Sequence, residues 1–126
     1  MGTRKNIIIL KIKRFIVFLI VNKFTGYLLS LFIKESINFQ NTKIKIKHLN
    51  YAQIAALYFN IYESKEVLFI NKYLNKKIPC IELGSSLGIV SCQIGKLNKK
   101  KKIFIYANST LKNTIESNLQ LNGIDN

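Results

Sequence analysis

The chain has 126 residues, of which 48% are hydrophobic, and this composition excludes an intrinsically disordered protein. Its formal net charge is +14, from 20 Lys+Arg against 6 Asp+Glu. The basic residues are mostly scattered lysines, whereas nucleic-acid interfaces favour arginine forks and clustered aromatic side chains, so we expect no nucleic-acid partner.

The N-terminal third contains a strongly apolar segment, residues 7–33. Four basic residues interrupt it: Lys11, Lys13, Arg14 and Lys23. Its longest uncharged stretch, residues 24–33, is shorter than the about 20 apolar residues of a membrane span. No small-residue cleavage site of a secretory signal follows. We expect one or two amphipathic helices, with Gly26 as their candidate break, that dock on a core; a peripheral membrane contact is the next alternative and a true span the last.

A strand is predicted over residues 42–50, where apolar and basic residues alternate. Ile44 and Ile46 point to one face. The lysines point to the other: Lys43, Lys45 and Lys47. The only histidine, His48, ends this strand without a nucleophile motif beside it, so we expect a surface residue and not a catalyst.

Residues 51–75 have helical periodicity with a break near Asn60. Glu63 and Glu66 lie at the start of the second part, where carboxylates complement the helix dipole, so they need no further function. Pro79 ends the helix because it disfavours helical backbone in the residue before it.

A strand, a glycine turn, a helix and a second strand follow Pro79. The first strand, "CIEL", leads into Gly84, and the helix begins after Gly88. This β-α-β order, with a further helix ending at Asn122-Gly123, is typical of a parallel sheet, in which ligands bind at the carboxyl ends of the strands. The run Lys99 to Lys102 is interpreted as a solvated connection.

The turn itself is open to two interpretations: a cradle for a ligand, or only a strand ending and a helix starting. It lacks the dinucleotide fingerprint, because Ser86 replaces its second glycine and Ile89 its third, and it is no P-loop. A carboxylate at the strand end, Glu82, suits a cationic group better than a phosphate.

The two cysteines, Cys80 and Cys92, form no Cys-x-x-Cys pair and have no histidine nearby. This pattern predicts no metal site and no disulfide framework. It indicates reduced, buried thiols in a cytoplasmic protein.

The segment from Tyr62 to Gly123 resembles the start of the catalytic domain of FkbM-type methyltransferases, which are class I enzymes that use S-adenosylmethionine. Their first motif reads approximately [E/D]-x-G-[AS]-x-[ILV]-G, and "ELGSSLG" at residues 82–88 fits it. Their second motif reads approximately [V/I]-E-A-N-P-x-L, and residues 105–111 are "IYANSTL". The helix that follows has the family's N-x-x-x-N spacing, here Asn118 and Asn122.

The resemblance implies an α/β fold, the start of a doubly wound (Rossmann-like) parallel sheet, with S-adenosylmethionine as the cofactor. The implied cofactor-binding residues are Glu82, Gly84, Ser85, Gly88, Tyr106 and Asn108. Tyr106 stands where the family has an acidic residue for the ribose hydroxyls, and its phenol makes one uncharged hydrogen bond. That loss amounts to about 1.5–3 kcal/mol, or roughly ten- to a hundredfold in affinity. Ser109 replaces the usual proline and is expected to cap the next helix.

The resemblance ends after the second strand-helix unit, so we expect an incomplete domain. Residues 1–50 are predicted as N-terminal helices and a short strand, and residues 51–126 as the beginning of a methyltransferase domain. The implied function is methyl transfer to an oxygen of a sugar or other small metabolite, with catalytic residues unassigned and weak or absent cofactor binding by the chain alone. The alternative is a small basic membrane-surface or interaction protein without catalysis, in contact with membrane through residues 7–33.

Overall fold

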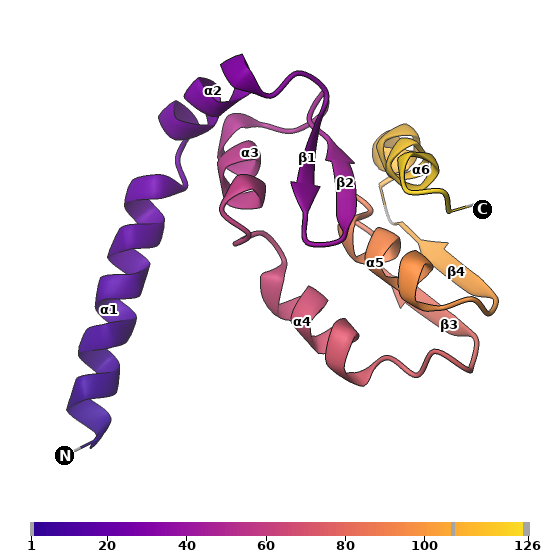
Figure 1. Ribbon diagram of the computed structural model, residues 1–126, viewed down its shortest axis with the longest axis horizontal. Coiled ribbons are helices and arrows are strands. Elements are labelled where there is room, and N and C mark those ends of the chain that lie inside the picture. Colours follow the sequence, from indigo (N-terminus) through magenta and orange to yellow (C-terminus); the bar gives the residue numbers. More distant parts are fainter. Residues whose placement is uncertain (1, 107, 125–126) are drawn as a thin grey trace.

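The computed structural model describes residues 2–106 and 108–124 (Figure 1). The chain begins with two helices, α1 (Gly2–Ile20) and α2 (Lys23–Phe32). They separate at Asn22, whose side chain caps α2 by accepting a 2.9 Å hydrogen bond from the Thr25 amide. The prediction that Gly26 separates them is wrong, because Gly26 lies buried inside α2.

Helix α2 docks on α3 (Tyr51–Tyr58), and Gly26 makes the close approach possible. A Cβ at Gly26 would overlap the Tyr51 carbonyl group and lie 2.8 Å from the Tyr51 Cα. The docking prediction is therefore confirmed for α2. It is wrong for α1, whose side chains from Asn6 to Leu19 are exposed except for the half-buried Val17, and which points away from the other elements in Figure 1.

A short antiparallel hairpin follows, formed by β1 (Ser36–Phe39) and β2 (Thr42–Lys45). The predicted alternation is confirmed within β2, where Ile44 is fully buried and Lys43 is exposed. The predicted extent of the strand, residues 42–50, is wrong, because β2 ends at Lys45. The sequence did not indicate β1, which pairs Ile37 with Ile44 and Phe39 with Thr42. His48 is exposed, as expected.

The predicted break near Asn60 is confirmed, with α3 before it and α4 (Ser64–Tyr73) after it. Asn50 and Gln53 start α3 with a capping box, in which each side chain accepts a 2.9 Å hydrogen bond from the backbone amide of the other. Asn60 has a left-handed backbone, with φ +55°. Helix α4 ends at Tyr73, earlier than Pro79 alone predicts.

The C-terminal half is a β-α-β unit followed by a helix, as predicted: β3 (Cys80–Leu83), α5 (Ile89–Leu97), β4 (Lys102–Ile105), a short 3₁₀ turn η1 (Ser109–Leu111) and α6 (Lys112–Leu121). Strands β3 and β4 pair in parallel, with Leu83 opposite Ile105. One face of this pair is exposed, and its side chains are Ile81, Leu83, Ile103 and Ile105. The chain is thus a mixed α/β protein with two separate two-stranded sheets in its described residues.

Helix α6 binds the free edge of β2 through two asparagines one turn apart. The Asn118 Oδ1 accepts a 2.9 Å hydrogen bond from the Lys45 amide, and the Asn122 Oδ1 accepts one of 2.9 Å from the Lys43 amide. The Asn122 Nδ2 donates to the Lys43 carbonyl at 2.7 Å. These bonds hold the hairpin against α6, and the hydrophobic core lies between these two elements.

That core joins the hairpin to the C-terminal helices. Its fully buried members include Phe39, Ile44, Leu57, Val67, Cys92, Ile115 and Leu119. Both cysteines are free; Cys92 is buried and Cys80 is half-buried. Burial raises the pKa of the Cys92 thiol to about 12, which keeps it protonated and unreactive.

Candidate functional site

The turn between β3 and α5 is held in place by the end of β4. The Gly84 and Ser85 amides both donate to the Ile105 carbonyl oxygen, at 2.8 and 3.0 Å. Gly84 and Gly88 have positive φ angles of +90° and +76°, a backbone that glycine adopts without strain. The loop is therefore fixed directly at the carboxyl end of the parallel pair.

The two glycines of the turn have different surroundings. Gly84 is exposed, and a Cβ there would meet nothing within 4 Å. Gly88 is buried, and a Cβ there would lie 3.2 Å from the Ile115 Cγ2 and 3.3 Å from its Cα on α6. Gly84 thus leaves backbone open to a ligand, whereas Gly88 lets α6 pack against the start of α5.

The carboxylate of Glu82 is oriented by two serines below the turn. The Ser91 hydroxyl donates to Glu82 Oε2 at 2.7 Å, and the Ser91 and Ser85 hydroxyl oxygens lie 3.1 Å apart. Ser85 and Ser91 are both buried. Burial raises the pKa of the Glu82 carboxyl above its ordinary value, and the serine hydrogen bonds oppose that rise.

A cavity of about 610 Å³ opens beside Glu82 and Gly84, between α4 and the glycine turn. Its lining residues are Glu63, Lys65, Glu66, Phe69, Ile70, Glu82, Leu83, Gly84, Ser86 and Val90. Three acidic residues and one lysine therefore line the same cavity. The sequence interpretation assigned Glu63 and Glu66 to the helix dipole and missed this convergence.

Glu63 is the most perturbed of these acids. Burial first, then the charges of Glu66 and Glu82, raise the pKa of Glu63 from 4.5 to about 7. Its backbone is left-handed, with φ +46°, and its side chain makes no capping hydrogen bond to α4. A non-glycine residue in this conformation is strained, and such residues cluster at functional sites. A cation in the cavity would relieve the repulsion among the three acids.

The other predicted cofactor residues lie outside this cavity lining. Tyr106 is half-buried against the core, next to the strand position that pairs with Leu83. The Asn108 Oδ1 accepts hydrogen bonds from the Thr110 amide at 3.0 Å and the Thr110 hydroxyl at 2.7 Å, so Asn108 caps η1. The prediction that Ser109 caps this helix is wrong, because the chain turns one residue earlier.

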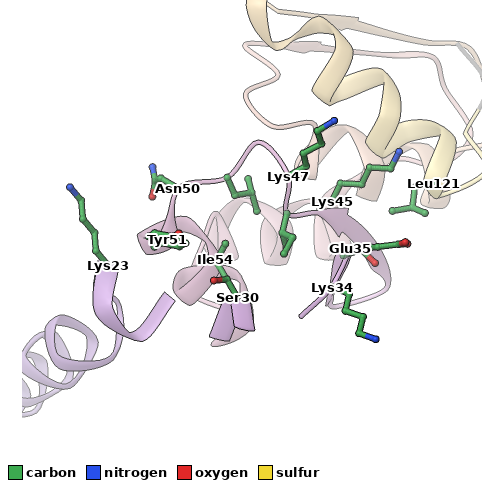
Figure 2. A pocket seen from close by; sticks show the side chains of 13 residues that line it. Lys23, Ser30, Lys34, Glu35, Lys45, Lys47, Asn50, Tyr51, Ile54 and Leu121 are labelled. Carbon is green, nitrogen blue, oxygen red and sulfur yellow. The ribbon is translucent and has the colours of Figure 1, made fainter. Parts of the chain in front are cut away.

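A second cavity, of about 1090 Å³, lies between α2, the hairpin, the start of α3 and the end of α6 (Figure 2). Four lysines line it: Lys23, Lys34, Lys45 and Lys47. Ile46, Leu49 and Ile54 supply an apolar surface, and Glu35 is the one acidic lining residue. No sequence motif marks this cavity, because its residues come from four separate segments.

The connection between α5 and β4 is rich in lysines. Lys99, Lys100 and Lys101 are exposed, in agreement with a solvated loop. For Lys102 this interpretation is wrong, because it is half-buried at the start of β4 and its ammonium group donates to the Asn98 carbonyl at 3.0 Å. In the described residues, no group of three or more His, Cys, Asp or Glu side chains is arranged to hold a metal ion.

Comparisons with protein-family models, with curated proteins and with solved structures found no match to this chain.

Proposed function

We propose that the turn after β3 binds the methyl donor S-adenosylmethionine, and that the chain carries the cofactor-binding start of a class I, FkbM-type methyltransferase. On this proposal β3 and β4 are two strands of a doubly wound, Rossmann-like sheet. The observation that carries the proposal is the cavity at the carboxyl end of β3, where Glu63, Glu66 and Glu82 lie beside exposed backbone at Gly84.

The chemistry of this cavity suits the cofactor. S-adenosylmethionine has an ammonium and a sulfonium group and no phosphate, so it matches a wall of carboxylates better than a nucleotide does. A volume of about 610 Å³ is within the ~300–1,000 Å³ usual for small-molecule sites. Space above Gly84 lets a ligand approach the backbone, which a side chain at this position would restrict.

The residues would divide the work as follows. Glu82, oriented by Ser91, would bind the ammonium end, and Glu63 would add charge as it ionises. Tyr106, at the same sheet edge, would give a ribose hydroxyl one hydrogen bond. The cofactor supplies an activated methyl group, and by resemblance the acceptor is an oxygen of a sugar or other small metabolite. Ser85, Gly88 and Asn108 would act by fixing the backbone rather than by touching the ligand.

Titration of the 126-residue chain with S-adenosylmethionine, followed by calorimetry and thermal shift, tests the proposal. We expect weak binding, with S-adenosylhomocysteine weaker still because it lacks the sulfonium charge. Glu82→Gln should lower the affinity for the methyl donor about tenfold. Glu116→Gln, an acid on α6 that does not line this cavity, is the matched control and should bind as the parent does.

Two results would overturn the proposal. One is a folded chain that shows no heat and no thermal shift with millimolar S-adenosylmethionine. The other is equal binding by the Glu82→Gln and Glu116→Gln variants. Gly88→Val is a poor probe, since its side chain would collide with Ile115 and disturb α6 whether or not a cofactor binds.

A further inference from the structure

Helix α2 has an apolar face that the protein does not cover. Its inner face, centred on Gly26, lies against α3. Five exposed apolar side chains lie outside this contact: Phe24, Tyr27, Leu28, Leu31 and Phe32. Tyr27 lies at the margin, where its ring also packs edge-on against the Tyr51 ring of α3. The spacing i, i+3, i+4, i+7, i+8 makes one continuous stripe, which we call the α2 stripe.

Helix α1 carries further exposed apolar side chains. From Ile7 to Leu19 it exposes nine large apolar side chains, and Figure 1 shows it projecting from the body of the protein. Among the described residues, no single helix is long and apolar enough to cross a bilayer. The pair formed by residues 6–20 and α2 reaches that length and apolarity together, but it is bent by 54°.

Basic residues surround this apolar surface. Lys23 begins α2 and Lys34 follows its end, and both line the lysine-rich cavity together with Lys45 and Lys47; the four ammonium groups point in different directions around it (Figure 2). On α1 the basic residues are Arg4, Lys5, Lys11, Lys13 and Arg14. With a net charge of +14, two copies of the chain repel one another, whereas an anionic apolar surface attracts both the lysines and the stripe.

We propose that the α2 stripe and α1 lie in the interfacial layer of an anionic lipid bilayer, with the lysine-rich cavity receiving a lipid phosphate. Long lysine side chains suit this position, because their stems cover apolar surface while the ammonium groups reach the headgroups. The bend at Asn22 lets α1 follow the bilayer surface while α2 stays attached to α3 through Gly26. The proposed membrane attachment does not depend on methyl-donor binding at the turn that contains Gly84.

Co-sedimentation of the full chain with phosphatidylcholine vesicles, with and without phosphatidylserine, tests the proposal. We expect binding to the anionic vesicles that weakens as salt is added. Leu31→Ser with Phe32→Ser should reduce this binding at least about tenfold. The matched control is Leu68→Ser with Tyr73→Ser on α4, since Leu68 is 62% exposed and Leu31 is 60% exposed. This control should bind as the parent does.

The lysine-rich cavity has its own variant pair. Lys34→Gln with Lys47→Gln should reduce binding to phosphatidylserine vesicles severalfold more than Lys99→Gln with Lys100→Gln, which removes the same charge from a solvated loop. Equal losses from the two pairs would overturn the phosphate site.

The membrane proposal fails if vesicles of either composition leave the folded chain in the supernatant, or if the stripe and α4 variants bind equally. It also fails if sedimentation velocity without lipid shows self-association that the stripe variant abolishes, because a second copy would then cover the stripe. Glu82→Gln should leave vesicle binding unchanged, so this test and the methyl-donor test fail separately.

Discussion

Asn118 is the side chain whose removal should most clearly report on how the fold is held together. It is fully buried on α6. Its Oδ1 accepts the 2.9 Å bond from the Lys45 amide, and its Nδ2 donates a 2.8 Å bond to the Leu87 carbonyl in the glycine turn. One amide group therefore connects α6 to both the hairpin and the candidate site.

The expected loss of stability follows from the two backbone groups that Asn118→Ala leaves without a hydrogen-bond partner. A buried donor or acceptor without a partner costs about 1–3 kcal/mol. The Leu87 carbonyl bond is buried and takes the upper part of this range, whereas the Lys45 amide bond is half-buried and takes the lower part because water reaches it. The sum is about 2–4 kcal/mol, against a typical total of about 5–15 kcal/mol.

Urea denaturation followed by far-ultraviolet circular dichroism measures this loss. We expect a lower midpoint with an unchanged slope, since the same surface is exposed on unfolding. Asn113→Ala, at an exposed position on the same helix, is the control and should change stability by less than about 0.5 kcal/mol. Asn118→Asp should destabilise at least as strongly, because an acceptor would then face the Leu87 carbonyl. An Asn118→Ala protein as stable as the Asn113→Ala protein would refute the reasoning.

Two further changes test other contacts. Gly26→Ala should destabilise the protein by about 1–3 kcal/mol, despite the better helix propensity of alanine, because its Cβ meets the Tyr51 backbone; an unchanged urea midpoint would contradict the close approach. Glu63 has a raised pKa, so the folded state holds its proton more tightly, and stability should fall as pH rises from about 4.5 to about 7. Glu63→Gln should flatten that part of the stability-against-pH curve, and this variant should be more stable than the parent above pH 7. If the curves of the parent and the variant stay parallel, Glu63 is not the group that titrates.

The sequence predicted the elements whose signals are local. The alternation around Ile44, the break at Asn60 and the glycine turn at Gly84 each follow from a few neighbouring residues, and the structure has all three. Strand β1 was missed because its alternation, from Ser36 to Phe39, stops at Gln40, whereas the alternation that begins at Thr42 continues in the sequence to Lys47. The role of Gly26 was misjudged because its partner, Tyr51, is a tertiary neighbour that no local pattern reveals.

The candidate site was predictable in part for the same reason. Glu82 and Gly84 stand at the end of a strand, and the cavity does open there. Glu63 joins them only because α4 packs on α5, a long-range contact that the helix pattern does not encode. The N-x-x-x-N spacing on α6 was visible, yet its hydrogen bonds to β2 depend on a hairpin more than 70 residues earlier in the chain.

The parallel pair β3–β4 is only weakly protected against local opening. Half of its side chains stay in water after folding, so apolar packing supports its ladder from one side alone. Segments with so little apolar cover open at free energies below that of global unfolding, and their amides exchange with solvent first. The amides of Gly84 and Ser85, which rest on the last carbonyl of β4, share in these openings. A ligand bound at the turn would therefore make these openings rarer in both strands. Ligand binding could then be measured as slower deuterium uptake by the amides of β3 and β4, including those that do not touch the ligand.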